Sequence, residues 1–490
     1  MIAAPHKVAV IGGGISGLAC AYRLRELAGQ RQIPLQITLF EASSRLGGVI
    51  QTEQRDGFIL ELGPDTFISQ KPWAVDLTRR LGFENELIGV TQAHQQSAIV
   101  YHGRLRPIPK GFYLLASPSF KTLCALPFIS FAGKCRMALE PLIPAAPDRG
   151  DESVASFIRR RFGEEALWRI GQPMIGGIYT ADPESLSLEA TFPRFRDLEL
   201  RCGSVLRGLR QEQTRNKENS GVEADASGPR YRLFLSFKRG MQTWVDCLTR
   251  NLKGVSIQTG KKNVCLNRTR ADGIHPVRWR LGFERGDVFE ADAVCLALPV
   301  RAAEKILQPV APEAACEIEK IGSESAVTLN FAFRREDCPR LPQGAGFVVP
   351  KIEGYPIAGV TFAHQKFEGR APRENVLIRA FTGGFYHREF LKLSDDHLVP
   401  LVLDALKQLL GIHAGTLWAK IQRHEESMPQ FAVGHRERVS RLKASMESYP
   451  GLFVTGNYLS GVGIPDCIHE SEETAGNLVR FLKIHQPSRL

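Results

Sequence analysis

The chain opens on an apolar stretch whose pattern changes period at a cluster of glycines. Residues 8–11 are all apolar, and residues 15–24 then place apolar side chains at helical spacing. This change of period predicts a buried strand, a tight turn and a helix. Gly12, Gly14 and Gly17 form the spacing G-x-G-x-x-G within the turn. This order of elements is typical of the phosphate-binding end of a dinucleotide-binding βαβ unit.

Each glycine in this turn has its own steric reason. Gly12 permits the tight turn, Gly14 lets backbone approach a pyrophosphate, and Gly17 lets the helix pack closely on the strand. Amides in the first helical turn face the phosphates, where the helix dipole favours negative charge. We therefore assign the whole turn to a dinucleotide cofactor: Gly12, Gly13, Gly14, Ile15, Ser16 and Gly17.

A second predicted strand, residues 35–40, ends at an acidic residue, Glu41. A carboxylate there accepts hydrogen bonds from the ribose hydroxyls of an adenosine and repels a 2′-phosphate. Arg45, Gly47 and Gly48 follow in the sequence RLGG. It resembles the second phosphate-contacting motif of flavoproteins of the amine oxidase and phytoene desaturase kind, which a nicotinamide dehydrogenase does not need. The pattern therefore predicts FAD as the cofactor.

The last part of the chain repeats this organisation. Residues 452–483 predict a strand, a glycine-rich turn that contains Gly461 and Gly463, and a long helix. Glycines in the turn allow backbone amides from Val462 to Ile464 to approach a polar ring edge or a phosphate closely. We therefore expect both ends of the chain to fold together into one discontinuous flavin domain.

The middle of the chain alternates between strand-like and helix-like patterns. Residues 97–109 have the pattern of a β-hairpin with its turn at His102-Gly103, and residues 320–385 are rich in strands. Residues 211–230 are almost wholly polar or small. Such a segment cannot bury enough surface to offset its ordering entropy, so we expect a flexible loop there.

Residues 113–195 are rich in Leu, Phe and Ala, and Pro and Gly break them into short helical patterns. Lys121, Lys134 and Arg136 interrupt the apolar surface. This pattern suits an ordinary buried helical subdomain. It equally suits a surface that dips into one leaflet of a membrane, with the cations against anionic headgroups. The sequence leaves both alternatives open, since an amphipathic helix has the same signature in either role.

Length and charge restrict the class of protein. At 490 residues the chain exceeds one ordinary core, so about two or three domains are expected. The net charge of +11 suits anionic partners. Basic residues are scattered, however, and the short cluster Arg159-Arg160-Arg161 has the pattern of a solvated helix face. We therefore do not expect a nucleic acid as partner.

Cysteine usage and hydropathy indicate the compartment. The ten cysteines include no C-x-x-C pair and no ligand-like Cys/His spacing, so we expect reduced thiols and no metal site. No apolar run reaches the roughly 18 residues that a spanning helix needs. Only MIAAPH precedes the first strand, which is too short for a secretory signal. We expect a cytoplasmic protein, either soluble or peripheral at the inner face of the cell membrane.

Seven stretches together resemble the oxygen-dependent, FAD-containing protoporphyrinogen oxidase family, which includes the coproporphyrinogen III oxidases. They are GGGISGLACAYRL, FEASSRLGG, ELGPDTF, GGIYTADPESLSLEATFP, ALP at 297–299, MPQFAVGH and GNYLSGVGIPDCI. The opening motifs are generic to flavoproteins, whereas GIYTADPESLS and GVGIPDCI are specific. The resemblance extends over nearly the whole chain, apart from residues 211–230.

The resemblance implies an α/β fold with a discontinuous Rossmann-like FAD-binding domain, a mixed-sheet substrate domain and a helical membrane-associated subdomain. The FAD-binding domain would comprise residues 1–90, 232–300 and 432–490. The substrate-binding domain would comprise residues 91–112, 196–231 and 301–431, and the helical subdomain residues 113–195.

The resemblance also extends the FAD site beyond the glycine turn, Glu41 and the RLGG motif. Val264 would offer backbone to the adenine, which is compatible with a place in the core of a strand. Trp418 would lie near the flavin, although a packed tryptophan explains that position equally. The implied further contacts are Gly63, Pro64, Asp65, Thr66, Val264, Trp418, Val462, Gly463 and Ile464.

Three positions are implied for a flat tetrapyrrole beneath the flavin ring. Phe362 would stack on the substrate, and Val348 would face it from the opposite side. The carbonyl of Gly177 would accept a hydrogen bond from a pyrrole N–H.

The family also provides a basic residue for a substrate propionate. In the plant-like branch this residue precedes the hairpin turn, but here that position is Tyr101. The carboxylate anchor is therefore open among Lys71, Arg104 and Arg106. Lys71 is preferred because it follows the flavin-contacting loop directly.

The resemblance implies an FAD-dependent oxidase that removes six electrons from a porphyrinogen in haem biosynthesis, with O2 as acceptor and H2O2 released. Protoporphyrinogen IX is the first choice of substrate and coproporphyrinogen III a close second. One alternative is a flavin amine oxidase, which needs an aromatic cage beside the flavin. Another is a non-enzymatic carrier on the same scaffold. The sequence does not determine whether the chain forms a homodimer.

Overall fold

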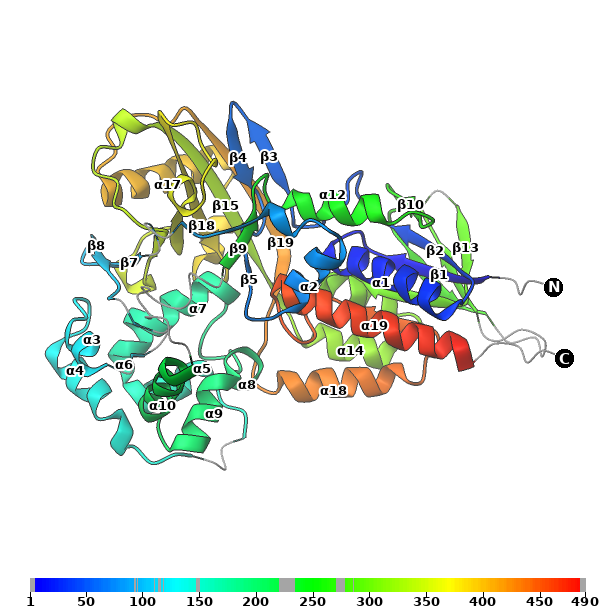
Figure 1. Ribbon diagram of the computed structural model, residues 1–490, viewed down its shortest axis with the longest axis horizontal. Helices are drawn as coiled ribbons and strands as arrows, with labels where there is room; N and C mark the ends of the chain where they lie inside the picture. The colour runs from blue at the N-terminus through cyan, green and yellow to red at the C-terminus, as the bar shows by residue number, and fades with distance from the viewer. Residues whose placement is uncertain are drawn as a thin grey trace.

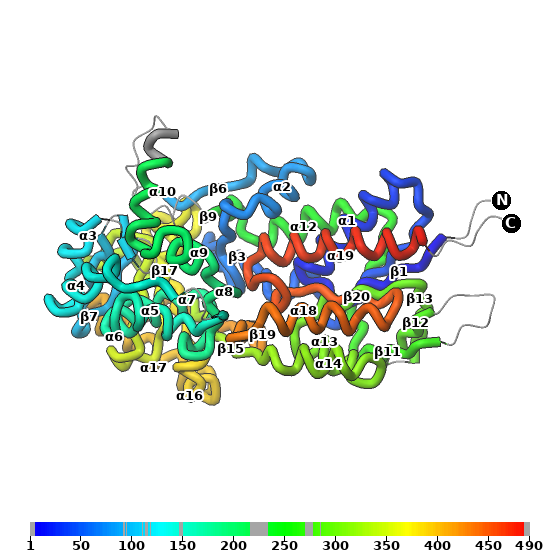
Figure 2. Tube along the Cα trace, turned by 90° about the horizontal axis from the view of Figure 1, so that it is seen from below, coloured from blue at the N-terminus to red at the C-terminus, as the bar shows by residue number. Residues whose placement is uncertain are grey.

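The computed structural model describes residues 5–484, except for residues 92–93, 95, 110, 113–115, 118, 147–149, 220–233, 270–277 and 285. Figure 1 shows an elongated molecule, with a parallel sheet towards one end and a mixed sheet and short helices towards the other. The first strand begins and the last helix ends at the same end of the molecule (Figures 1 and 2). The two terminal segments thus lie side by side.

A five-stranded sheet forms the centre of the first part, in the order β10-β2-β1-β14-β20. All of its strand pairs are parallel. Because parallel sheets are buried on both faces, their strands are near-continuous apolar runs, as residues 8–11 are. The strands are β1 (His6–Ile11), β2 (Leu35–Phe40), β10 (Ser256–Gln258), β14 (Ala293–Ala297) and β20 (Leu452–Thr455).

Helices cover both faces of this sheet. One face carries α1 (Ile15–Arg31), α12 (Gln242–Asn251) and α19 (Ile464–Ile484). The other carries α13 (Val300–Leu307), α14 (Pro312–Glu319), α18 (His435–Met446) and an antiparallel sheet of β11 (Cys265–Arg268), β12 (Trp279–Gly282) and β13 (Val288–Ala291). Alternate residues of β1 point to the two sides, Val8 and Val10 to α1 and Ala9 and Ile11 to α14. The predicted strand–turn–helix at each chain end is confirmed.

A seven-stranded mixed sheet forms the second part, in the order β19-β15-β18-β17-β16-β7-β8. Only β16 and β7 pair in parallel among these strands. The predicted hairpin with its turn at His102-Gly103 is confirmed, since Tyr101 pairs with Arg104. The strands are β7 (Ser97–Tyr101), β8 (Arg104–Pro107), β15 (Ser323–Arg334), β16 (Gly346–Val348), β17 (Gly359–Phe362), β18 (Asn375–Gly383) and β19 (Trp418–Pro429).

The two faces of this sheet differ. One face packs in an apolar cluster against α17 (Asp395–Leu410), which includes Leu398 and Val402. We call the opposite side the site face. Directly paired residues of neighbouring strands point to the same side of a sheet. The strand register therefore places two rows on the site face, Val348–Gly359–Phe381–Thr328 and Thr361–Arg379–Asn330.

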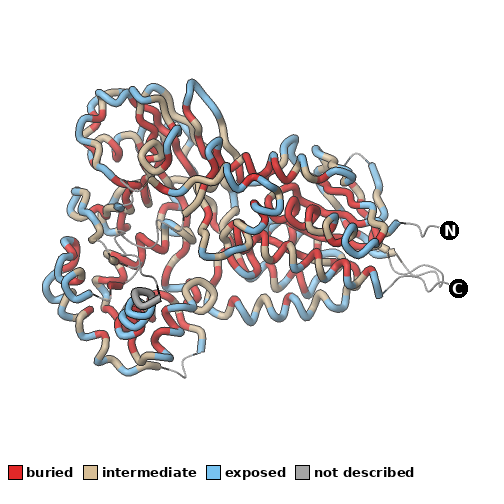
Figure 3. The backbone as a smooth tube through the Cα atoms, in the orientation of Figure 1, coloured by how far each residue is buried: buried red, intermediate tan, exposed pale blue. Residues whose placement is uncertain are grey.

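Smaller elements connect the two parts. The hairpin of β3 (Thr52–Arg55) and β4 (Phe58–Glu61) precedes α2 (Trp73–Arg80), and β9 (Phe234–Phe237) pairs with both β5 (Phe67–Ile68) and β6 (Leu87–Gly89). Buried backbone, drawn red in Figure 3, runs through the centre of both parts.

Short helices form a third cluster with an apolar core of its own, which includes Phe157, Leu167 and Ile175. These helices are α3 (Phe120–Cys124), α4 (Phe131–Ala138), α5 (Val154–Phe162), α6 (Glu164–Ala166), a π-helical turn η5 (Leu167–Gly171), α7 (Gln172–Tyr179), α8 (Leu188–Thr191), α9 (Pro193–Cys202) and α10 (Val205–Asn219).

The prediction of a flexible loop over residues 211–230 was wrong for its first part. Helix α10 continues to Asn219. Residues 211–219 are polar, but Gln, Glu, Arg and Lys are good helix formers, and they extend a helix that the preceding residues already anchor. The remainder, residues 220–230, lies outside the described residues.

The packing also differs from two expected domain boundaries. Leu198 and Val205, expected in the substrate domain, lie in the core of the helical cluster. Ala303 and Ile318, also expected there, pack on the parallel sheet. Amphipathic helices bury their apolar stripe on whichever face is free nearby, and the sequence does not reveal that face. We propose to assign residues 196–219 to the helical part and 301–322 to the flavin part.

The interpretation of Arg159-Arg160-Arg161 as a solvated face was wrong for its last two members. The Arg161 side chain is 0% exposed and forms ion pairs with Glu140 and Glu199. Arg160 is 15% exposed and also pairs with Glu199. Buried carboxylates from other helices supply the partners that a buried guanidinium requires.

Two further findings concern membrane-spanning helices and the cysteine thiols. None of the helices in the described part of the chain is both long enough and apolar enough to cross a bilayer. The ten cysteines all lie within the described residues, and all are free thiols, as predicted.

Candidate cofactor and substrate site

The glycine turn between β1 and α1 divides into two kinds of position. A Cβ atom on Gly12 would lie 2.2 Å from the Ala297 carbonyl oxygen, and one on Gly17 would lie 1.8 Å from the Gly12 carbonyl oxygen. These glycines therefore allow backbone to pack on backbone. A Cβ atom on Gly14 would meet only the Gly48 Cα atom, at 3.9 Å. Gly14 thus borders open space at the start of α1, where no side chain caps the helix amides.

Glu41 lies directly beside this turn. Its carboxylate accepts hydrogen bonds from the amides of Gly13 at 2.7 Å and Ser43 at 2.8 Å. Each carboxylate oxygen has a second lone pair that can accept from a ribose hydroxyl. The Gly47 amide also donates to the Gly13 carbonyl at 2.8 Å. The glycine turn, Glu41 and the RLGG loop therefore form one continuous cradle.

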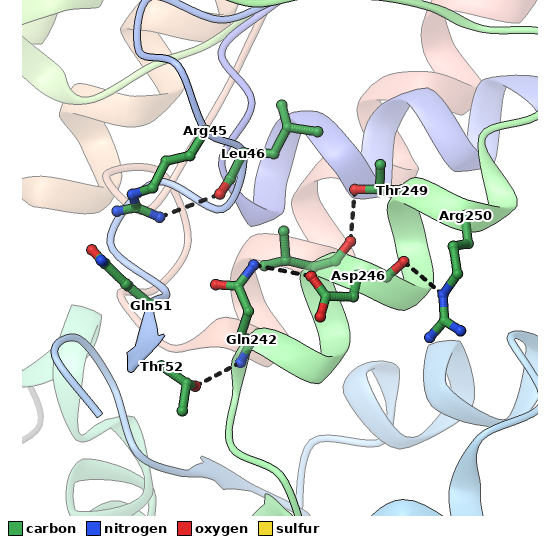
Figure 4. Close-up of a pocket in the computed structure, with 9 residues that line it drawn as sticks. Arg45, Leu46, Gln51, Thr52, Gln242, Asp246, Thr249 and Arg250 are labelled. Carbon is green, nitrogen blue, oxygen red and sulfur yellow. Dashed lines mark hydrogen bonds between the residues drawn. The ribbon is translucent and has the colours of Figure 1, made fainter. Parts of the chain in front are cut away.

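Arg45 orders its own loop in this structure. Its guanidinium donates to the carbonyl oxygens of Leu46 at 3.2 Å and Ile50 at 3.1 Å, and also to that of Gly48. Figure 4 shows this side chain at the edge of a cavity of about 510 Å³ between the loop and α12. We propose that Arg45 serves the cofactor by shaping the backbone of Gly47 and Gly48.

The segment after β4 lies against this loop. A Cβ atom on Gly63 would lie 1.7 Å from the Val49 carbonyl oxygen, so only glycine fits there. Side chains of the seven-stranded sheet hold the same segment from the other side. Thr328 and His424 bind the Leu62 carbonyl oxygen at 2.8 Å each, and Arg379 donates to the Gly63 carbonyl oxygen. The predicted Gly63–Thr66 contact region is thus fixed between both large sheets.

The C-terminal glycine turn reaches the same place. A Cβ atom on Gly456 would lie 3.1 Å from the Leu298 carbonyl oxygen, and one on Gly12 would lie 3.2 Å from the Leu298 side chain. Helices α1 and α19 share one buried cluster, to which Ile15 and Ile464 both belong. The two glycine-bearing ends of the chain therefore meet in a single cradle.

A sequence model of flavin containing amine oxidoreductases matches residues 15–479. The chain belongs to the flavin containing amine oxidoreductase family. It is an oxidoreductase with an FAD cofactor, as predicted. The residues of the cradle fit this group, because Gly14 leaves room beside uncapped helix amides and Glu41 retains acceptor capacity. Family membership does not support the non-enzymatic carrier.

Individual relatives cover nearly the whole chain. It is 32% identical over 476 residues to the coproporphyrinogen III oxidase of Bacillus subtilis (strain 168), covering 97% of this chain and 98% of that protein. It is 27% identical over 492 residues to protoporphyrinogen oxidase 1, chloroplastic, of Arabidopsis thaliana, covering 96% and 88%. A crystal structure from Exiguobacterium sp. 255-15, provisionally assigned as a protoporphyrinogen oxidase, matches with TM-score 0.84 at 27% identity, covering 98% and 99%. The predicted resemblance and fold class are confirmed.

Two predicted cofactor residues lie further from the glycine turns. The segment before Val264 runs beside Glu41, because the Lys261 amide donates to the Glu41 carbonyl at 2.9 Å. This position suits an adenine contact, which we propose. Trp418 instead packs edge-to-face on Phe58 with 5.0 Å between ring centroids. Phe58 is five residues before Gly63, on the order of 16 Å along an extended strand, so we leave Trp418 out of the proposed cofactor set.

The C-terminal turn also determines the surroundings of Lys71. Its Nζ lies 2.5 Å from Asp466 Oδ1, in the first turn of α19. Cβ atoms on Gly461 and Gly463 would both lie within 3 Å of that carboxyl group. Lys71 therefore already has an anionic partner, which argues against it as the preferred carboxylate anchor.

The prediction for Phe362 was wrong. Its side chain is 1% exposed and lies in the apolar cluster beneath α17, on the side of the sheet that faces away from Val348. Successive residues of a strand alternate between faces, and one residue of register decides the side. The half-buried aromatic on the site face is Phe381, in the same row as Val348. The alternation in NVLIRAF could have revealed it, because Arg379 marks the non-core face.

Val348 and helix α7, which carries Gly177, share one apolar cluster. Val348 packs against the helical cluster to which α7 contributes Met174 and Ile175. Gly177 is exposed, and a Cβ atom on it would meet nothing within 4 Å. It lies in the last turn of α7, where carbonyl oxygens lack helical partners. The carbonyl of Gly177 accepts no backbone hydrogen bond from outside the helix among the described residues.

Tyr101 contacts a basic residue that sequence reasoning missed. The Arg169 guanidinium lies over the Tyr101 ring, 4.7 Å from its centroid, and its Nη1 donates to Glu353 at 2.6 Å. Its Nε and Nη2 have no partner among the described residues. Arg104 and Arg106 pair across the hairpin with Tyr101 and Ile99, so their side chains lie on the same side of the sheet.

Two carboxyl groups near the cradle titrate abnormally. Burial acts to raise the pKa of Asp65, but Lys366 at 2.8 Å and Arg379 lower it to about 2. Burial raises the pKa of Glu61 to about 7, despite Arg370 at 3.8 Å. Asp65 is therefore ionised at neutral pH, whereas Glu61 is partly protonated.

Replacement of Gly14 by Val should abolish FAD binding without unfolding the protein. The Gly14 backbone has φ −73°, which any residue adopts, and its Cβ position is open. The valine side chain would instead occupy the space that the pyrophosphate needs. The flavin absorbance of the purified variant and its circular dichroism melt measure the two properties.

Gly17→Ala is the matched control, because its Cβ would collide with the Gly12 carbonyl and lower thermal stability itself. A folded Gly14→Val protein with full flavin content would contradict the cofactor assignment.

Proposed function

We propose that this chain is a flavin-dependent porphyrinogen oxidase of haem biosynthesis that acts on coproporphyrinogen III, with protoporphyrinogen IX as second choice. One observation carries the proposal. The site face, which carries the half-buried Phe381, adjoins the cofactor cradle, since Thr328, opposite Phe381, binds the Leu62 carbonyl. Three arginines border that face at Tyr101, which suits an apolar ring system with anionic substituents.

The arginines favour the substrate with more carboxylates. Coproporphyrinogen III has four propionates and protoporphyrinogen IX two, and Arg104, Arg106 and Arg169 surround one end of the site face. Relatives named coproporphyrinogen III oxidase are 28–32% identical to this chain, and plant protoporphyrinogen oxidases are 27–29% identical, so identity alone does not separate the two substrates. The arginines therefore carry the reversal of the preference that the sequence alone suggested.

When bound, FAD would supply the hydride acceptor for two-electron oxidations, with O2 as final acceptor and H2O2 as product. The chain's own residues would position the substrate. Phe381 and Val348 offer an apolar surface on which a tetrapyrrole can lie flat. The carbonyl of Gly177, which has no hydrogen-bond partner from outside the helix among the described residues, lies at the negative end of the α7 dipole and would accept pyrrole N–H groups.

Arg169 is our choice for the carboxylate anchor. It emerges from the π-helical turn η5, eight residues before Gly177. Its ring contact with Tyr101 fixes the guanidinium plane, and its Nε and Nη2 remain available for a bidentate carboxylate contact. Arg169, on η5, would therefore take the role that a basic residue at the position of Tyr101 has in the plant-like branch of the family.

Phe381→Leu should raise KM for the porphyrinogen several-fold while FAD content stays at the wild-type level. The reason is that leucine fills similar space but offers no flat ring for stacking, which contributes on the order of 1 kcal/mol. Fluorescence-detected porphyrin formation gives KM.

Phe362→Leu, in the apolar cluster beneath α17, is the matched control and should lower the melting temperature without a change in KM. Equal KM values for wild type and Phe381→Leu would remove Phe381 from the site.

Arg169→Leu should impair coproporphyrinogen III oxidation at least tenfold in kcat/KM and affect protoporphyrinogen IX less. Loss of one charge-assisted carboxylate contact costs about 1.5–3 kcal/mol. The measurement is kcat/KM for both porphyrinogens, determined in parallel for wild type and variant. The control is Arg159→Leu, which removes an arginine on the outer side of α5.

An equal effect of Arg169→Leu on both substrates would contradict the anchor role. Reduction of the wild-type flavin by primary amines and by neither porphyrinogen would instead favour the amine oxidase alternative.

We further propose that the helical part contacts anionic membranes. Phe120, Phe131 and Leu142 expose 61%, 83% and 73% of their surface, and Lys121 and Lys134 lie on the same short helices. Large exposed apolar side chains beside cations are typical of helices that insert partway into one leaflet.

The triple change of Phe120, Phe131 and Leu142 to Glu should reduce co-flotation with liposomes of anionic lipid at least tenfold. Each apolar side chain contributes about 1.5–3 kcal/mol when it leaves water. Leu401→Glu, an exposed position on α17, should leave flotation unchanged. Unreduced flotation of the triple variant would indicate that this surface does not bind lipid.

A further inference from the structure

Arg379 occupies the middle of β18 on the site face, and its side chain is only 3% exposed. Its guanidinium donates to the Gly63 carbonyl oxygen, and its Nη1 lies 3.8 Å from Asp65 Oδ1. The group also lies over the Phe381 ring, 4.8 Å from the centroid. One buried cation thus contacts the predicted flavin-contacting loop and the aromatic of the site face at once.

The buried charges around Arg379 do not cancel. Lys366 adds a second positive charge, and its Nζ lies 2.8 Å from Asp65 Oδ2. Asp65 is the ionised carboxylate between them. Arg370, four residues after Lys366, faces Glu61 at the end of β4, and burial of Glu61 disfavours its charged form. Three cations therefore face one full negative charge and one partial negative charge, and the surplus is positive.

The hydrogen bonds of Arg379 are also incomplete. Its Nε is buried without a partner among the described residues, and so is Oδ1 of Asn330, which lies directly opposite on β15. His424 of β19, which binds the Leu62 carbonyl at the start of this loop, is kept neutral because burial lowers its pKa. A buried guanidinium with unused donor capacity exerts more of its charge on its surroundings than a fully paired one.

We propose that Arg379 is a positioning residue that fixes the Gly63–Asp65 loop and raises the reduction potential of bound FAD. The inference rests on the proposed function only in that this loop borders the flavin. Two-electron reduction places negative charge on the cofactor. A buried surplus of positive charge therefore stabilises the reduced form more than the oxidised form. Lys366 contributes in the same sense by compensating Asp65.

The test compares the midpoint potential of FAD in purified wild type, Arg379→Gln and Arg379→Lys holoenzyme. We expect Arg379→Gln to shift the ratio of oxidised to reduced FAD at least tenfold towards the oxidised form. For a two-electron couple, this corresponds to a midpoint potential about 30 mV lower. Arg379→Lys keeps the charge and should recover most of the shift. An unchanged potential in Arg379→Gln, or an equal loss in both variants, would overturn the proposal.

Arg370→Gln is the control for loss of any buried guanidinium. Arg370 donates to the carbonyls of Phe237 and Lys238 and not to the Gly63–Asp65 loop, so Arg370→Gln should shift the midpoint potential less than Arg379→Gln does. An equal shift would overturn the assignment to Arg379. If Arg379→Gln does not fold, the midpoint potential of Lys366→Gln is measured instead. We expect it to be lower than that of wild type, and an unchanged potential would contradict the proposal. Absence of FAD from wild type would refute the proposed function instead.

Discussion

Close approach of backbone to backbone is the constraint on which this structure depends. Gly12, Gly17 and Gly63 stand where a Cβ atom would fall within about 2 Å of a carbonyl oxygen of a neighbouring segment. No side chain is small enough to be accommodated there, so the first turn, the RLGG loop and the segment after β4 meet only through glycine. The parallel sheet, α1 and α19 are arranged around that contact, and the cofactor cradle follows from it.

The second sheet also holds the loop after β4 in place. Its side chains bind the main-chain carbonyls of the loop after β4, through Thr328, His424 and Arg379. Because these donors come from three strands of the sheet, the loop is held by a rigid element and not by its own contacts. In the proposed site this arrangement would couple the position of the cofactor to that of the substrate, since β18 carries both Arg379 and Phe381.

Charge has different roles in the two halves of the proposed site. Arginines at the hairpin edge are exposed or partly exposed, so water screens them and they suit recognition of flexible carboxylates. Arg379 and Lys366 are buried, so their charges act at longer range on whatever the cradle holds. The buried ionic cluster of Arg161, Glu140 and Glu199 belongs to neither role, since its charges are compensated within the helical part.

The sequence by itself determined the cofactor class, the elements at both chain ends and the family. Glycine spacing and the change of hydrophobic period are local properties that a chain carries wherever it folds. Only the tertiary structure decided that Phe362 points away from the site and Phe381 towards it, because alternation along a strand does not say which face another element will cover. It also decided that Lys71 has Asp466 as its partner and that Arg169 lies over Tyr101. These contacts join residues separated by 395 and by 68 positions, and no local pattern encodes which distant segment arrives beside another.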